Sequence, residues 1–134
     1  MNTTSKKFLK EKFLEYYRSS SIDFPVRSDR REWGFVLFDN AYPKLVMRRH
    51  RHYPSEEELH TYISSYAPAH AFYSVAYYQD PGKAKMSEKG RQGADLIFDL
   101  DAEKIEGDPS QALGKVKLEV DKLLDFLLED FGFR

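Results

Sequence analysis

Residues 93–103, with the sequence GADLIFDLDAE, alternate between two kinds of side chain, and they limit the possible folds more than any other stretch. Successive side chains of an extended strand point to opposite faces of the sheet. One face of the predicted strand is apolar and is expected to join the core: Ala94, Leu96, Phe98 and Leu100. The other face is mostly acidic: Asp95, Ile97, Asp99 and Asp101. The pattern therefore predicts a strand that ends in carboxylates.

Asp99 and Asp101 are spaced suitably for a site that binds divalent cations. At ~3.3 Å per residue their Cα atoms would lie roughly 6.5–7 Å apart. Mg²⁺ prefers oxygen ligands and is often held by one or two carboxylates together with waters and substrate phosphates. Two such ions can act together in phosphoryl transfer. The alternative is a strand end that faces solvent, with aspartates that only stop the strand.

The composition favours a folded protein without disulfides. The chain has 134 residues, of which 41% are hydrophobic and 15% aromatic, so it can bury a core as one domain or part of one. Without cysteine it can form neither disulfides nor cysteine-ligated zinc sites. Its four histidines do not show the spacing of a metal motif. No apolar run approaches 18 residues and no signal-type segment follows the start, so we expect an intracellular protein that does not enter a membrane.

Hydrophobic periodicity predicts three helices, at residues 6–18, 55–65 and 108–131. Ser55 and Asp108 are the expected N-caps of the second and third helices, and Gly132 is expected to end the third. Strands are expected at residues 30–38, 44–48, 70–78 and 94–101, with the first two forming a hairpin and the third mostly buried. The leucine stripe of the last helix should cover the sheet. The predicted class is α+β (mixed α/β), with helices packed on a sheet.

Residues 44–52 form a basic patch without any acid. Arg48, Arg49 and Arg51 are its arginines, and they are candidates for binding the phosphates of a nucleic acid or nucleotide. A solvated loop or an edge strand would have the same composition. The lysines of residues 83–92 leave the same two interpretations open.

Several motifs, taken in order, resemble those of one known family. The first is Arg31-Glu32-Trp33-Gly34-Phe35, and the second is the aromatic run at residues 72–78. The most specific is Phe98-Asp99-Leu100-Asp101 within GADLI, and the last are the leucine- and phenylalanine-rich segments at residues 123–127 and 129–133. Together they resemble the catalytic small subunit of archaeal-type DNA primase, from about Tyr16 to the end of the chain. The resemblance implies the N-terminal part of the primase catalytic domain.

The resemblance also implies an activity and a set of functional residues. The family synthesises short primers on single-stranded DNA templates from nucleoside triphosphates, using Mg²⁺ or Mn²⁺ bound by the two carboxylates of this motif. By resemblance these carboxylates are Asp99 and Asp101. Glu32 is the third catalytic residue that the resemblance implies, near the catalytic centre, where it would orient a metal-bound water or a substrate hydroxyl. Asp95 could tune the site without binding a metal ion itself, although a structural role fits it better. The implied partner is the large primase subunit, and the implied location is the cytoplasm, in association with the nucleoid.

The sequence also departs from the family pattern. It lacks the third metal-binding aspartate and the Ser-Gly-x-x-Gly-x-His type of stretch that contacts the incoming nucleotide. It has no cysteine, so neither a zinc knuckle nor bound zinc is expected. We therefore expect an N-terminal fragment of a longer subunit that is inactive alone. The alternatives are a non-catalytic module that binds single-stranded nucleic acid or a partner, and another metal enzyme with paired aspartates, such as a nuclease.

Overall fold

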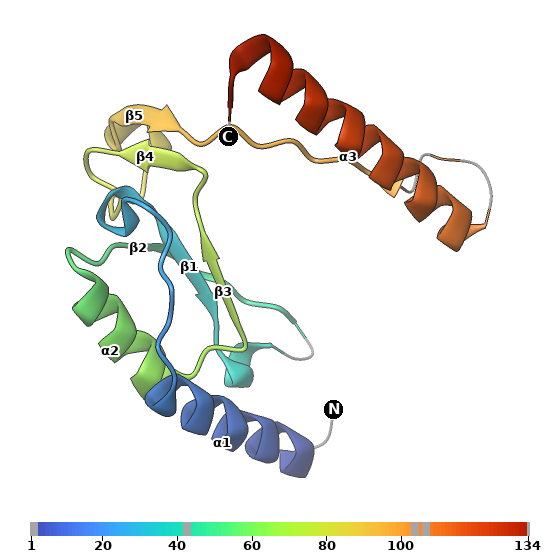
Figure 1. Cartoon of the computed structure of the whole chain (residues 1–134). Coiled ribbons are helices and arrows are strands. Elements are labelled where there is room, and N and C mark those ends of the chain that lie inside the picture. The colour runs from blue at the N-terminus through green and yellow to red at the C-terminus, as the bar shows by residue number, and fades with distance from the viewer. Residues whose placement is uncertain (1–2, 42–43, 103–104, 106–107, 134) are drawn as a thin grey trace. The chain divides into compact units, whose positions relative to one another are not determined.

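The computed structural model describes residues 3–41, 44–102, 105 and 108–133. The chain divides into two compact units, Met1–Leu96 and Ile97–Arg134. The first contains α1 (Thr3–Ser19), β1 (Trp33–Val36), β2 (Arg48–Arg51), α2 (Glu56–Tyr66), β3 (His70–Tyr73), β4 (Ala76–Tyr78) and β5 (Arg91–Ala94), and the second contains α3 (Pro109–Phe131) (Figure 1). Helices together with antiparallel sheets confirm the predicted α+β class. In the part of the chain that the structure describes, no helix has the length and apolarity needed to cross a membrane.

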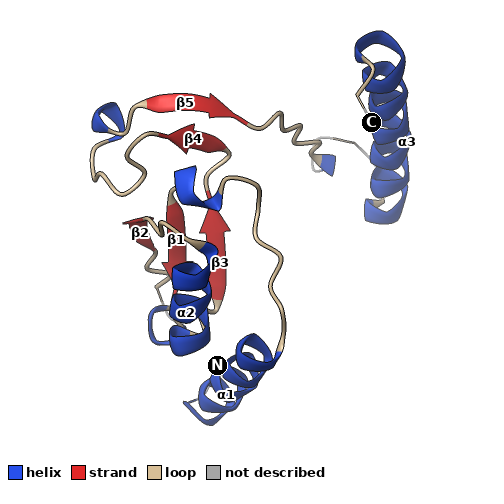
Figure 2. Cartoon of the chain, turned by 60° about the vertical axis from the view of Figure 1, so that its left-hand side comes forward, coloured by secondary structure: helices blue, strands red, loops and turns tan. Residues whose placement is uncertain are grey.

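The first unit contains two antiparallel sheets. One has three strands in the order β2-β1-β3, and the other is the two-stranded pair β4-β5 (Figure 2). Trp33 and Phe35 of β1 pack with Leu59 and Ile63 of α2 to form the core, and Leu37 completes it. Because Phe35 and Leu59 are fully enclosed, burial of these apolar side chains is what fixes α2 against one face of the sheet.

The helix boundaries agree with the capping signals in the sequence. The Ser55 hydroxyl accepts a hydrogen bond from the Glu58 backbone N–H at 3.2 Å, so Ser55 caps α2. Asp108 caps α3 in the same way, accepting from the Ser110 N–H at 3.1 Å. Gly132 has φ +66° and ends α3 in the left-handed conformation that glycine adopts without strain. These three expectations are confirmed.

The hairpin is confirmed, but its return strand was placed too early in the sequence. The strand pairing with β1 is Arg48–Arg51, whereas residues 44–48 were expected. The predicted turn includes residues 42 and 43, which lie outside the described residues. The strand predicted at residues 70–78 is divided at Ser74 between the two sheets, and β3 is exposed along its whole length. The expectation that this run is mostly buried is therefore wrong.

The strand predicted at residues 94–101 is also wrong, because β5 ends at Ala94. Ala94 pairs with Ala76, and the Asp95 N–H then donates to the Val75 carbonyl at 3.1 Å. The segment that pairs with β5 turns away at this point toward β3, so among the described residues no strand pairs with the backbone beyond Asp95. The expected apolar face is open: Leu96 is 63% exposed and Phe98 48%. Alternation alone did not suffice to make a strand.

Within the second unit, the apolar stripe of α3 is exposed. Leu124 is 57% exposed and Phe131 61%, and of the residues described in this helix only Ala112 is fully buried. Among its described residues, the second unit has no other α-helix or strand to cover the stripe. The amphipathic pattern correctly predicted the helix, but it did not predict what the helix packs against.

Candidate functional site

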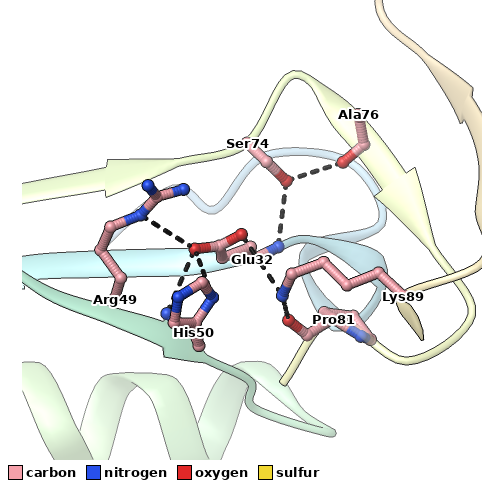
Figure 3. Close-up of polar contacts among 7 residues, drawn as sticks. All are labelled: Glu32, Arg49, His50, Ser74, Ala76, Pro81 and Lys89. Atoms are coloured by element: carbon pink, nitrogen blue, oxygen red, sulfur yellow. Dashed lines mark hydrogen bonds and ion pairs between the residues drawn. The ribbon is translucent and has the colours of Figure 1, made fainter. Parts of the chain in front are cut away.

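Glu32 lies directly before β1, and its side chain is only 7% exposed. Its Oε1 accepts hydrogen bonds from Arg49 Nε at 3.3 Å and from the His50 backbone N–H at 3.2 Å (Figure 3). Its Oε2 lies 3.3 Å from Lys89 Nζ. The carboxylate is thus held by two cations and a backbone donor, all of them from this chain.

These contacts keep Glu32 ionised. Burial opposes its charged form, but the hydrogen bond from His50 together with Lys89 and Arg49 outweighs burial, and the net effect is a lowered pKa. A carboxylate in this state accepts hydrogen bonds and does not donate a proton near neutral pH. Glu32 is therefore suited to holding cations in place.

A β-bulge in β2 makes this arrangement possible. Trp33 pairs with Arg51 and Phe35 with Arg48, so two residues of β2 lie between pairs that enclose a single residue of β1. His50 has φ +58°, which is unusual for a residue other than glycine. The bulge accompanies an arrangement in which the Arg49 side chain and the His50 N–H both reach Glu32. Sequence reasoning missed it, since no residue in the stretch marks a bulge.

Lys89 is fully enclosed, although the sequence left open whether it is a solvated loop cation. Besides its ion pair with Glu32, its ammonium group donates to the Pro81 carbonyl and lies 5.5 Å from the centre of the Tyr78 ring. Lysine is rarely buried without a partner. Lys89 therefore belongs to the interior of the first unit and is not available to bind phosphate.

The basic patch lies on β2, at the edge of the three-stranded sheet. Arg48 and Arg51 are exposed, and the Arg49 side chain is 56% exposed although it contacts Glu32. The arginines of the predicted basic patch therefore lie on a strand and at the surface. Its position alone permits both phosphate binding and the ordinary protection of a sheet edge by charge.

A cavity of about 360 Å³ lies beside Glu32 and Arg49. Arg49 and Glu32 line it together with Met47 and the aromatic residues Phe72 and Tyr73 of β3. A Cβ atom at Gly34 would lie 2.9 Å from the Met47 sulfur, so the absence of a side chain there makes room for Met47. The cavity therefore presents a cation beside aromatic rings, a combination that suits a nucleotide.

Asp99 and Asp101 lie beyond β5 in the second unit, in a stretch that is neither helix nor strand. Both residues are exposed, and carboxylate oxygens are the ligands that Mg²⁺ or Mn²⁺ prefers. Within the described residues, no group of three or more histidine, aspartate or glutamate side chains is arranged to hold a metal. Glu32 and the three arginines belong to the first unit, where the structure brings Glu32 and Arg49 together.

Asp95, expected on the same face as Asp99, has a different environment. Its carboxylate forms an ion pair with Arg31 and accepts a hydrogen bond from the Tyr77 hydroxyl. Sequence reasoning quoted Arg31 only as part of a motif and assigned it no role. The position of Arg31 beside an acidic residue, just before a buried strand, was the available signal of a structural role. Its partners Ser74 and Tyr77 could not be identified, because they are 43 and 46 residues away in the sequence.

Comparison with known proteins identifies relatives that match the whole chain. It is 48% identical to a protein named DNA primase small subunit PriS from Methanococcoides burtonii, and the match includes 100% of this chain and 35% of that protein. Proteins of the same name from Methanoregula boonei and Methanosarcina barkeri are 47% and 44% identical, over 98% and 99% of this chain. The chain spans about a third of the length of these relatives. No protein-family model matches it. The relatives confirm the resemblance found in the sequence motifs.

Proposed function

Because the chain is related over its whole length to an N-terminal portion of DNA primase small subunits, we propose that it forms the corresponding part of a primase catalytic subunit. The complete subunit would synthesise short primers on single-stranded DNA from nucleoside triphosphates by nucleotidyl transfer. The observation that carries this proposal is the identity of 48% over 100% of the chain. Residues 1–134 would then be one domain or the N-terminal fragment of one.

In this proposal Asp99 and Asp101 bind Mg²⁺ or Mn²⁺ through their exposed carboxylates. Such ions, when bound, would lower the pKa of the primer 3′-hydroxyl and stabilise the departing pyrophosphate. Two carboxylates leave several positions around each ion for water, substrate phosphates and residues outside this chain. We therefore propose that residues 1–134 are inactive alone, and we assign no role to zinc.

The residues of the first unit are assigned to binding and positioning. Arg48 and Arg51, exposed on the edge strand, would contact the phosphates of template or nucleotide. Arg49 would do so from the wall of the cavity, with Glu32 holding its guanidinium at 3.3 Å. Glu32 would then act through Arg49, because its own oxygens already contact Arg49, His50 and Lys89.

A small subunit implies a large one, and we propose that the complete protein pairs with the large primase subunit in the cytoplasm at the nucleoid. Co-expression of a tagged complete subunit with the large subunit from the same genome should yield a complex of the two chains. Recovery of the small subunit alone at micromolar concentration would contradict the pairing.

Primer synthesis tests the activity. The protein translated from the complete reading frame should extend primers on single-stranded DNA in the presence of Mn²⁺ and nucleoside triphosphates. Asp99→Asn keeps the shape of the side chain but removes its charge. It should lower the rate by about 100-fold or more, since even changes outside the metal ligands cost about 10–100-fold. Asp121→Asn, at an exposed aspartate of α3, is the matched control and should leave the rate unchanged. Equal rates for wild type and Asp99→Asn would refute the assignment.

A second candidate is a non-catalytic module that binds single-stranded nucleic acid or a partner protein. It is favoured by the exposed arginines of β2. Fluorescence anisotropy with labelled single-stranded DNA would measure binding by the 134-residue chain. Replacing Arg48 and Arg51 by alanine should reduce the slope of log K against log salt by about 0.7 for each DNA phosphate that these arginines neutralise. DNA binding without primer synthesis by the complete protein would favour the module.

A further inference from the structure

Arg31 is a buried arginine that the proposed function does not use. Its side chain is 2% exposed. Nε donates to the Val26 carbonyl at 3.0 Å, and one terminal nitrogen donates to the Ser74 carbonyl at 2.8 Å. The other terminal nitrogen donates to the Tyr77 hydroxyl at 3.0 Å and lies 2.7 Å from Asp95 Oδ2. All three guanidinium nitrogens therefore have partners, and the partners come from three separate segments.

Two aromatic rings complete the environment of Arg31. Its Cζ lies 4.5 Å from the centre of the Tyr77 ring and 5.1 Å from that of Tyr73. A desolvated guanidinium in contact with two rings gains attraction from their π-electrons. The planar, forked head group of arginine suits this arrangement, whereas the ammonium of lysine could not bond in three directions with the same geometry.

Asp95 is held at the point where the β4-β5 ladder ends. Oδ2 pairs with Arg31, and Oδ1 accepts from the Tyr77 hydroxyl. Its backbone N–H donates to the Val75 carbonyl at 3.1 Å. The hydrogen bond from Tyr77, and after it that from Arg31, keep the pKa of Asp95 below its ordinary value. Since both carboxylate oxygens are engaged, Asp95 is a poor ligand for a metal ion.

Asp95 is also the last residue with a ladder contact before the stretch that carries Asp99 and Asp101. Residues 95–100 form neither helix nor strand, so no further regular backbone bonding restricts this stretch. Four residues can span up to about 13 Å. Releasing Asp95 would therefore give Asp99 a much larger volume to explore.

We propose that Arg31 and Tyr77 are positioning residues that hold Asp95 and thereby restrict the stretch carrying Asp99 and Asp101. This inference rests on the proposed function insofar as those two aspartates bind the metal ions. Arg31 and Tyr77 contact neither ion nor substrate in this scheme. Loss of this anchoring should appear as a higher Mn²⁺ requirement and as a more mobile backbone at residues 96–101.

The test uses three substitutions and one control. Tyr77→Phe removes only the hydroxyl that bonds to Asp95. Asp95→Ala removes the whole carboxylate, and Arg31→Lys keeps the charge but loses the forked geometry. Asp80→Asn, at an exposed aspartate in the turn after β4, is the control.

The first readout needs neither metal nor activity. ¹⁵N relaxation of the 134-residue chain should show lower order parameters at residues 96–101 in Asp95→Ala, Tyr77→Phe and Arg31→Lys, with α2 unchanged. The control should match wild type. Unchanged order parameters at 96–101 in all three variants would overturn the proposal.

The second readout is the Mn²⁺ concentration that gives half-maximal primer synthesis by the complete protein. It should rise about tenfold in Asp95→Ala and Tyr77→Phe, with most of the rate recovered at high Mn²⁺. A purely structural role would lower the rate equally at every Mn²⁺ concentration in proportion to the folded fraction, and that result would overturn the proposal. If wild type makes no primers at all, the proposed function fails, and the order parameters alone decide whether Arg31 and Tyr77 restrict the stretch.

Discussion

Replacing Lys89 by methionine should destabilise the first unit strongly. Methionine has a similar length but no charge, so the variant leaves the Glu32 carboxylate buried without its lysine and the Pro81 carbonyl without its donor. Removing one partner of a buried ion pair typically costs about 3–5 kcal/mol. We expect the lower end of this range, because Arg49 and the His50 N–H still contact Glu32 at 3.3 and 3.2 Å.

The single tryptophan provides the assay. Trp33 is 3% exposed and stacks on Phe35 with ring centres 6.1 Å apart, so its fluorescence reports unfolding of the core. For a unit of this size, a loss of about 3 kcal/mol corresponds to a fall in the melting temperature of roughly 12–24 °C. Urea titration would give the free energy of unfolding directly.

Two further variants make the reasoning refutable. Lys83→Met changes an exposed lysine of the same loop and should cost less than about 0.5 kcal/mol. Arg49→Met removes the partially exposed partner of Glu32 and should cost about 1 kcal/mol. If Lys89→Met is no more destabilising than Lys83→Met, the buried ion pair does not stabilise the fold. If Arg49→Met costs as much as Lys89→Met, burial does not make the Lys89–Glu32 ion pair more stabilising than the exposed one.

Three other predictions follow from the structure. The pKa of Glu32 is lowered in the folded state, so its stabilising effect is complete above its ordinary pKa near 4.5 and is lost as the pH falls through the folded-state pKa. Urea unfolding between pH 3 and 7 should therefore show a smaller loss of stability at acid pH for Glu32→Gln than for wild type. Leu59→Ala, in the core, should lower the free energy of unfolding by about 2–5 kcal/mol, whereas Leu124→Ala on α3 should cost less than about 1 kcal/mol; similar losses would mean that α3 is covered in solution. Ser55→Ala should cost about 1 kcal/mol through loss of the α2 cap, measured by the same titration, and no loss would show that the 3.2 Å hydrogen bond is not important.

The features predicted correctly depend on residues that are close together in the sequence. The cap at Ser55 involves the N–H three residues later, and the end of α3 depends on the conformational freedom of Gly132. The class of fold follows from the periodicities of these same segments. Such signals are local, so the chain itself carries them.

The features that were missed depend on contacts between distant segments. Whether residues 95–100 form a strand depends on a neighbouring backbone, and the segment that pairs with β5 turns away at Ser74. The burial of Lys89 depends on Glu32, 57 residues earlier, and the role of Arg31 depends on Asp95. Composition identified these residues as charged, but it could not show which charges are enclosed.

The site was predicted only in part for the same reason. The exposed arginines of β2 lie where an edge strand places them, and Glu32 and Arg49 meet through a bulge that no sequence signal marks. Asp99 and Asp101 were selected through an alternation that does not form a strand, together with a family resemblance that the relatives confirm. Their assignment as metal ligands remains a prediction.

Arg31 and Glu32 are neighbours in the sequence, yet their side chains serve two separate charge clusters. Arg31 bonds to Ser74, Tyr77 and Asp95, whereas Glu32 bonds to Arg49, His50 and Lys89. Inserting or deleting one residue beside β1 would turn each of these two side chains to the opposite face of the sheet. A glutamate would then meet carbonyl oxygens and Asp95, and an arginine would meet two cations. The run from Arg31 to Trp33 should therefore tolerate no change in length, even where individual substitutions are accepted.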